Sequence, residues 1–270
     1  MEAIMKNILL LVHDDDGQFA RLHTAIDLTC ALDGHLICID VTPSPVYAGN
    51  AYGGFGASLL LNDERENEAR NRARTKERVA GANISWSWED ATGDFAQCVI
   101  DASNLADLIV LNRALDDYPL PDMRTITSRV LMHARKPIVA VPEEVESFNA
   151  KGRAIIAWDG QESVAATMRA CVPLLQLASD VEIFMVRDGA AKTEPEEAAA
   201  YLARHGIHAN VKIVEDGVHH ADVLIENAAR HWRAEYILMG AYSHGRLMEA
   251  FGGVTKRMLS NCKLPLVIGH

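Results

Sequence analysis

Four glycines in the C-terminal part of the chain form a cluster whose chemistry suits an anion. Gly240, Gly245, Gly252 and Gly253 lie between an apolar run and a helix expected to begin near Val254. Glycine lets backbone N–H groups approach an anion closely, and a helix N-terminus adds exposed N–H groups and a positive dipole end. The segment therefore predicts a phosphate cradle, although a tight loop needed only for packing explains the same glycines.

Polar side chains in this segment add binding groups without forming a catalytic set. Ser243 and Thr255 offer hydroxyls, and His244 and Arg246 offer donors or charge. The sequence G-A-Y-S-H-G lacks the G-x-S-x-G spacing of a nucleophile elbow, and a triad requires convergence in space. We therefore assign no catalytic residue.

Aspartates follow the first apolar run of each half of the chain. Asp159 precedes Gly160, where an Asx turn or N-cap and a contact with a ligand are compatible roles. Asp14, Asp15 and Asp16 are predicted to form a solvated turn and cap rather than a metal cluster. Asp222 follows two histidines, but no third metal ligand is evident, so it is predicted to cap the next helix.

The chain contains an internal repeat. Residues 127–142, TSRVLMHARKPIVAVP, align with residues 255–270, TKRMLSNCKLPLVIGH, at an offset of 128 (255 − 127). Asp16-Gly17-Gln18 aligns with Asp159-Gly160-Gln161 at an offset of 143 (159 − 16), so the first copy holds additional residues. We place them in a Gly- and Tyr-rich loop, Pro43–Leu61, which could cover the first copy's pocket or form an oligomer contact.

Each copy predicts an open α/β domain with five parallel strands. Apolar runs alternate with helical stretches such as 20–32, 63–79 and 222–232, which indicates a parallel sheet with right-handed crossovers. The predicted strands are 8–12, 36–41, 84–88, 108–111 and 138–141, then 154–157, 181–186, 211–214, 236–239 and 266–268. Residues 1–146 and 150–270 form the two predicted domains, and ligands of such sheets bind beyond the carboxyl ends of the strands.

The first copy lacks the glycine cluster. At the offset of 128, the four glycines are replaced in order by Asn112, Asp117, Arg124 and Thr125. Asp116 adds a second carboxylate, and Pro119 and Pro121 remove two backbone donors. Because carboxylates repel phosphate, the first copy is predicted to hold no phosphate site.

GAYSHGR…FGGVT and AWDGQES, together with the repeated domain, resemble the universal stress protein family. The resemblance implies two tandem adenine nucleotide alpha hydrolase-like (Rossmann-like) domains. It also implies G-x2-G-x9-G-[S/T] after strand four and an Asp after strand one that contacts adenosine. Ser243 stands at the motif's second glycine, and the spacing to Gly252 is one residue short. By this resemblance the nucleotide-binding residues are Asp159, Val186, Gly240, Ser243, Gly245, Gly252, Gly253, Val254 and Thr255.

The resemblance leaves three functions open. The first is a non-enzymatic tandem universal stress protein of the stress response, binding ATP or another adenine nucleotide, with Mg²⁺, in its second domain. The second is a slow ATPase, although no Walker motif is present. The third is a nucleotide-independent scaffold or signalling protein. Domains of the family pair through their last strands, so Pro137–Pro142 and Pro265–His270 are expected to pair within the chain, and a homodimer of the chain is expected in addition.

The composition excludes several other classes. A formal net charge of −11, with no basic patch, disfavours nucleic acid as a partner. No apolar run approaches the roughly 20 residues of a spanning helix, so no membrane partner is expected, and the N-terminal run predicts a strand rather than a signal peptide. The 5 cysteines have no CxxC spacing, which favours reduced thiols in a cytoplasmic protein.

Overall fold

The computed structural model describes residues 5–43, 57–113, 123–187, 192–215, 220–241 and 253–270, the side chains at 43, 57–67 and 124 excepted. Helices and strands alternate along both halves of the chain, as predicted. The first half contains β1 (Asn7–Val12), α1 (Gln18–Ala31), β2 (His35–Pro43), α3 (Ala57–Gly81), β3 (Ser85–Gly93), α4 (Phe95–Ala102), β4 (Leu108–Asn112), α5 (Met123–His133) and β5 (Ile138–Val141). The second contains β6 (Arg153–Trp158), α6 (Glu162–Ala170), α7 (Val172–Leu175), β7 (Asp180–Arg187), α8 (Pro195–Ala203), β8 (Ala209–Glu215), α9 (Ala221–Trp232), β9 (Ala234–Gly240), α10 (Gly253–Asn261) and β10 (Leu266–Gly269).

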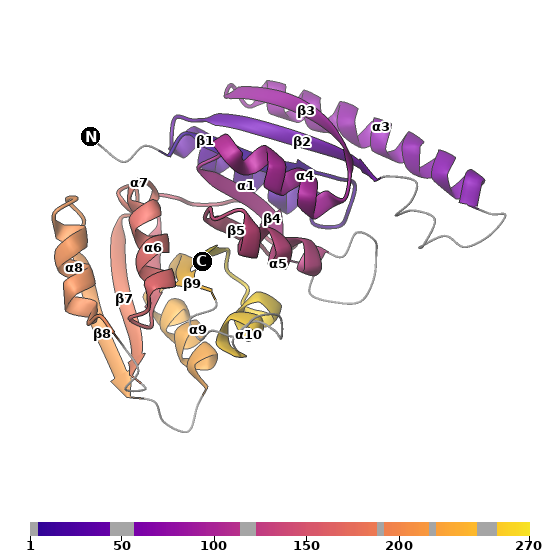
Figure 1. Cartoon of the computed structure of the whole chain (residues 1–270). Helices are drawn as coiled ribbons and strands as arrows, with labels where there is room; N and C mark the ends of the chain where they lie inside the picture. Colours follow the sequence, from indigo (N-terminus) through magenta and orange to yellow (C-terminus); the bar gives the residue numbers. More distant parts are fainter. Residues whose placement is uncertain (1–4, 44–56, 114–122, 188–191, 216–219, 242–252) are drawn as a thin grey trace.

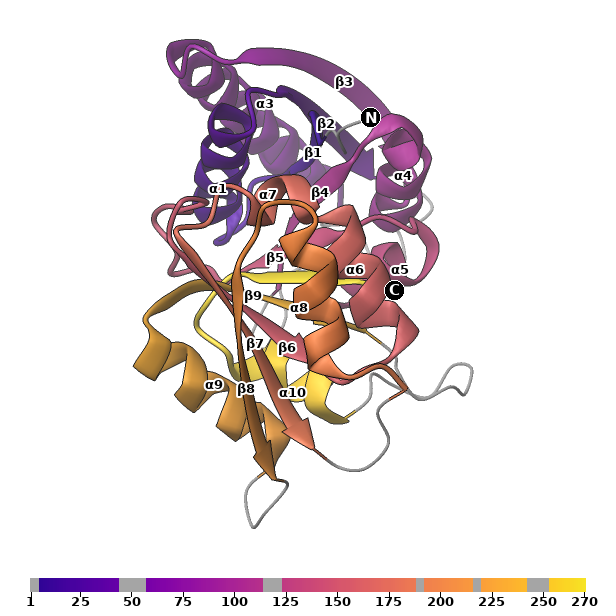
Figure 2. The same cartoon turned by 90° about the vertical axis from the view of Figure 1, so that its left-hand side faces the viewer.

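The described strands form one 10-stranded sheet in the order β3-β2-β1-β4-β5-β10-β9-β6-β7-β8 (Figures 1 and 2). Neighbouring strands are parallel within each half, and β5 pairs with β10 in the antiparallel direction. The two halves therefore have the same strand order, and each changes direction between its first and fourth strands. The predicted α/β architecture is confirmed.

The β5–β10 ladder relates the halves by a local pseudo-two-fold axis. Val139 lies opposite Val267, and these two residues are each other's equivalents in the repeat (267 − 139 = 128). Ile138 and Ala140 lie opposite Ile268 and Leu266. This pairing of the last strands within one chain was predicted, and it removes both strands from the edge of the sheet.

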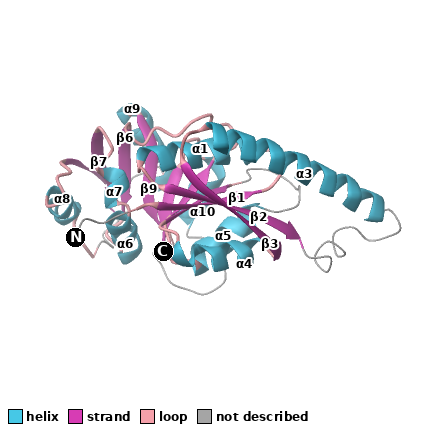
Figure 3. Ribbon diagram, turned by 90° about the horizontal axis from the view of Figure 1, so that it is seen from above, coloured by secondary structure: helices cyan, strands magenta, loops and turns pink. Residues whose placement is uncertain are grey.

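The alternating side chains of the buried strands fill two hydrophobic cores, one on each face of the sheet. Ile8 and Leu10 of β1 belong to the core that α1, α6 and α8 cover, whereas Leu9 and Leu11 belong to the core that α4, α5, α9 and α10 cover. Each core includes residues of both halves. Figure 3 shows α1 and α3 on one side of the first-half strands and α4 and α5 on the other.

A buried arginine connects the two halves. Arg113 follows β4 and is 1% exposed, and its Nη1 atom donates to the carbonyl oxygens of Met258 (2.5 Å) and Leu259 (2.9 Å). Both carbonyls belong to the last turn of α10, where a cation interacts favourably with the helix dipole. Burial lowers the pKa of this guanidinium. Arg113 thus connects the end of β4 to a helix of the other half.

The predicted bounds of the Pro43–Leu61 loop and the predicted start of the helix that follows it were wrong. The loop predicted over Pro43–Leu61 overlaps β2 and α3, because α3 begins at Ala57 and not near Asp63. The residues at its start, ASLLL, are good helix formers, so the glycine-rich composition upstream obscured the beginning of the helix. The loop itself lies mainly outside the described residues.

Within the described residues no helix is long and apolar enough to span a membrane.

Candidate functional site

The second half brings three of the predicted binding residues to one edge of the sheet. Trp158 lies opposite Met185 and Ala157 lies opposite Met239 in the parallel ladders that flank β6. Because parallel strands end at the same edge, Asp159, Val186 and Gly240 lie at neighbouring strand ends. This edge is where the sequence placed the ligand site. Ser243, Gly245 and Gly252 lie outside the described residues.

Asp159 shapes the turn that leads into α6. Its Oδ1 atom accepts a hydrogen bond from the Gln161 backbone N–H (3.0 Å), which is an Asx turn. Gly160 has a φ of 71°, a left-handed conformation that favours glycine. The N-cap position of α6 is Gln161, so the Asx-turn role of Asp159 is confirmed and the N-cap role is wrong.

Gly240 allows the end of β9 to contact the start of α6. A Cβ atom at this position would lie 2.5 Å from both the Ser163 Oγ atom and the Val164 backbone nitrogen. The requirement for glycine is therefore steric, and it brings the first turn of α6 against the strand end. This turn carries the N–H groups and the positive dipole end that favour an anion.

The second helix N-terminus at this edge belongs to α10, which begins at Gly253. Val254 is half-buried and Thr255 is 6% exposed. Arg257, to which the sequence analysis gave no role, carries a guanidinium whose Nη1 atom lies 2.9 Å from the Cβ position of Gly253. Gly253 itself is exposed. A guanidinium therefore lies beside the first residue of α10, where it adds N–H donors to those of the helix N-terminus.

Asp222 forms an ion pair with Arg257. Arg257 Nε donates to Asp222 Oδ1 (2.7 Å), and the prediction that Asp222 caps α9 was wrong because His220 occupies the N-cap position. In the first half the equivalent residue, Asp94, does cap α4, and it pairs with Arg129 at 2.8 Å. Because α9 begins earlier relative to the repeat, Asp222 lies inside its first turn. The repeat contained this signal, since both ion-pair partners align at the offset of 128.

The corresponding edge of the first half is filled by a buried arginine. Arg21 of α1 is 0% exposed and extends between the end of β1 and the end of β4. Its guanidinium donates to five residues: Leu11 O (2.8 Å), His13 O (3.1 Å), Asp15 Oδ1 and Oδ2 (3.0 and 2.8 Å), Gln18 Oε1 (2.8 Å) and Asn112 Oδ1. Asn112 also donates through Nδ2 to the Gly17 carbonyl at 2.9 Å. The position between the first and fourth strands is thus occupied by protein side chains.

Acidic groups surround this occupied position. The side chain of Asp15 is 11% exposed, so the prediction of a solvated cap was wrong for this residue, and Gly17 is the N-cap of α1. Burial, together with the nearby Asp16 and Asp15 carboxylates, raises the pKa of Glu143, which follows β5. Asp117, Asp116, Pro119 and Pro121, on which the sequence argument about the first copy depended, lie outside the described residues.

Within the described ranges the strand-end edges show no cluster of metal ligands, and no cysteine is in a disulfide. In the described ranges no group of three or more His, Cys, Asp or Glu side chains is placed to hold a metal ion. All five cysteines are free thiols: Cys30, Cys38, Cys98, Cys171 and Cys262. His219 lies outside the described residues.

The fold matches solved structures over its whole length. A universal stress protein from Archaeoglobus fulgidus DSM 4304 superposes with a TM-score of 0.75 at 15% identity, covering 99% of this chain and 98% of that one. A functionally unknown protein from Pseudomonas aeruginosa PAO1 superposes with a TM-score of 0.59 at 18% identity, covering 98% and 92%. No protein-family model and no curated protein matches the sequence. The chain therefore has the universal stress protein fold over its full length.

Proposed function

We propose that this chain is a tandem universal stress protein that acts in the cytoplasm without a catalytic step. In this proposal its second half binds an adenine nucleotide, ATP with Mg²⁺, at the carboxyl ends of β6 and β9. The observation that carries the proposal is a difference between the halves at equivalent positions. Arg21 and Asn112 occupy the position between strands one and four of the first half, and their equivalents are Val164 and Gly240.

This difference in side chains between the two halves supports a ligand site in the second half only. Val164 offers no cation and Gly240 offers no side chain, so within the described residues no equivalent of the Arg21 guanidinium lies between the start of α6 and the end of β9. Gly253 contributes a second helix N-terminus, and Arg257, whose Nε atom is paired with Asp222, places its Nη1 atom beside it as a hydrogen-bond donor. Both features favour a polyphosphate. By the family resemblance, Asp159 contacts the adenosine and Val186 lines the base pocket.

Gly253→Glu provides a sharp test of the site. The new carboxylate would lie at the first position of α10 beside Arg257, where the helix dipole and the cation both favour it. The variant is therefore expected to fold, while its negative charge repels phosphate. The matched control is Thr125→Glu, because Thr125 is the exposed first-half equivalent of Gly253 (253 − 128 = 125).

The experiment measures nucleotide released from natively purified protein by ion-exchange chromatography, followed by titration with ATP and Mg²⁺. We expect about one nucleotide per chain, at least about tenfold weaker binding in Gly253→Glu, and no change in Thr125→Glu. An empty preparation that does not bind added ATP supports the scaffold function and contradicts the proposal. Phosphate release that Gly253→Glu abolishes would instead identify a slow ATPase.

A homodimer of the chain is also part of the proposal. Because β5 and β10 pair with each other, the outer strands β3 and β8 are the edges that the described sheet offers to a second chain. Light scattering on the purified protein is expected to give about twice the chain mass of 29.6 kDa. A mass equal to one chain would contradict this part alone.

A further inference from the structure

A histidine and two serines form a cluster at the amino ends of β2 and β3, far along both strands from the edge where the candidate ligand site lies. His35 is the first residue of β2, and it lies opposite Ser85, the first residue of β3, in the parallel ladder. Ser87 follows two residues further along β3, so its side chain is on the same face of the sheet. The register therefore places one imidazole within reach of two hydroxyls.

Both nitrogens of the His35 ring contact a serine hydroxyl. Nδ1 lies 2.7 Å from Ser85 Oγ, and Nε2 lies 2.9 Å from Ser87 Oγ. A neutral imidazole has one N–H donor and one acceptor nitrogen. Because the shorter distance is typical of a hydroxyl donor and the longer one of an N–H donor, the Ser85 hydroxyl donates to Nδ1 and Nε2–H donates to Ser87. The basic nitrogen of the ring thus faces Ser85, and Ser87 orients the ring.

The hydroxyl of Ser85 is accessible from solvent. Ser85 is exposed, whereas His35 and Ser87 are half-buried. These side chains lie on the same face as Ile37, which packs on the core that α4 covers. However, the 8 residues of α4 span about 12 Å, whereas the 9 residues of β3 span about 30 Å, and α4 starts from the carboxyl end of β3. The amino end of β3, the outer strand of the first half, therefore extends beyond this helix (Figure 1).

A hydroxyl that donates to a neutral imidazole, which a third group orients, has the arrangement of an activated nucleophile. We propose that Ser85 is a covalent modification site that accepts an acyl group from a small activated carboxylic ester. The Ser85 Oγ atom forms a bond to the acyl carbon, and the bond from that carbon to the leaving oxygen breaks. The hydroxyl proton passes to His35 Nδ1 and then to the leaving oxygen, so the imidazole returns to its neutral form. The product is a serine ester, and its formation does not depend on nucleotide binding by the second half.

Two variants and two controls test this assignment in the full chain. Ser85→Ala removes the nucleophile, and His35→Gln removes the base but keeps a polar side chain, so both are expected to fold, which circular dichroism checks. His208→Gln makes the same change at another histidine, which is exposed. Ser179 is the internal control, because this exposed serine has its hydroxyl 3.5 Å from the Asp180 carboxylate rather than beside an imidazole.

The probe is 4-nitrophenyl acetate, and peptide mass spectrometry follows the acetylation of each serine with time. We expect the ester at Ser85 to form at least about tenfold faster than one at Ser179, about tenfold more slowly in His35→Gln, and at an unchanged rate in His208→Gln. Ser85→Ala should lose this ester without gaining one at Ser87.

Two results would overturn the proposal. If Ser85 in the unaltered chain reacts no faster than Ser179, or if His35→Gln leaves its rate unchanged, the cluster is a cross-strand polar contact only. Acetylation of Ser87 in place of Ser85 would overturn the assignment of the nucleophile. The comparison of Ser85 with Ser179 needs no variant, so it decides the question even if a substitution disturbs the fold.

Discussion

Replacement of Arg21 by methionine is expected to destabilise the first half severely. Methionine keeps an unbranched side chain that fills the inner part of the same space, but it removes every donor of the guanidinium. The Asp15 carboxylate, 11% exposed, then loses its cation, and the Leu11 and His13 carbonyl oxygens lose a donor. Breaking a buried ion pair by removing one partner costs about 3–5 kcal/mol. This is a large part of the roughly 5–15 kcal/mol that stabilises a typical domain.

Urea unfolding followed by circular dichroism measures this loss, and hydrogen exchange with mass spectrometry locates it in the first half. Arg21→Lys keeps the charge but not the planar fork, so an intermediate loss is expected. Adding Asp15→Asn to Arg21→Met removes the unpaired carboxylate and should recover part of the stability. A loss below about 1 kcal/mol in Arg21→Met would refute the reasoning, because it would place the pair in the range of solvent-exposed ion pairs.

Three further predictions concern packing, thiols and pH. Gly17→Ala directs a methyl group into the Asn112 amide and should cost about 1–3 kcal/mol in urea unfolding; an unchanged midpoint would contradict the packing. Burial raises the pKa of Cys171 to about 12, so mass spectrometry should find exposed Cys30 alkylated by iodoacetamide in native protein and Cys171 only after unfolding. Burial favours the neutral form of Asp94, but its guanidinium partner and the N–H groups of α4 outweigh this and lower the pKa. The stability that Asp94 contributes is therefore present above about pH 4 and lost as the pH falls through the lower folded pKa, so the destabilisation by Asp94→Asn should shrink in acid; a pH-independent difference would contradict it.

The sequence predicted the features that depend on local pattern. Buried strands such as β4 and β5 are short apolar runs, and the repeat of residues 127–142 in 255–270 predicted that the two last strands would pair. Arg21 was not recognised because a single polar residue in an amphipathic helix is usually solvent-exposed. Its decisive partner, Asn112, lies 91 residues away in sequence.

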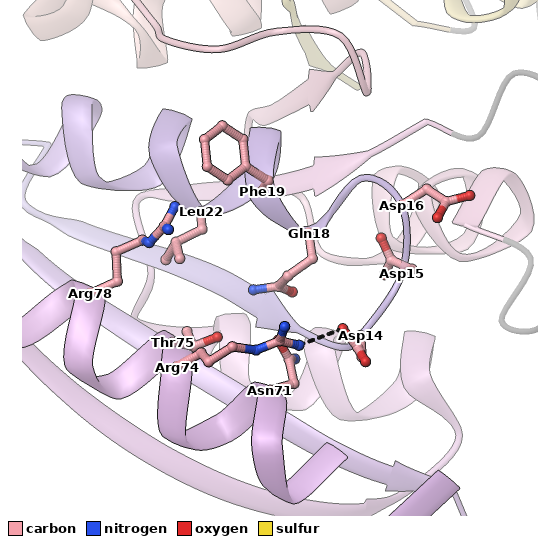
Figure 4. A pocket seen from close by; sticks show the side chains of 10 residues that line it. All are labelled: Asp14, Asp15, Asp16, Gln18, Phe19, Leu22, Asn71, Arg74, Thr75 and Arg78. Carbon is pink, nitrogen blue, oxygen red and sulfur yellow. Dashed lines mark hydrogen bonds and ion pairs between the residues drawn. The ribbon is translucent and has the colours of Figure 1, made fainter. Parts of the chain in front are cut away.

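Two buried amide nitrogens without partners among the described residues, those of Gln18 and Asn71 (Figure 4), could not be predicted for the same physical reason. Both residues belong to helices whose relative placement depends on the packing of both against the sheet. Nothing in the local sequence around either residue indicates that its amide nitrogen lacks a partner. The ion pair of Asp222 with Arg257 is different, because Asp94 and Arg129 align with these two residues at the offset of 128, so the repeat itself indicates a pair in each half.

Because β5 pairs with β10 of the same chain, the two halves can diverge in sequence during evolution. In a dimer of identical chains, every substitution appears twice, and a change that fills one site fills both. Here the two partners belong to one polypeptide, so an arginine at position 21 is accompanied by valine at position 164 without conflict. The covalent link thus permits one half to specialise in internal structure while the other remains free to acquire or retain a ligand.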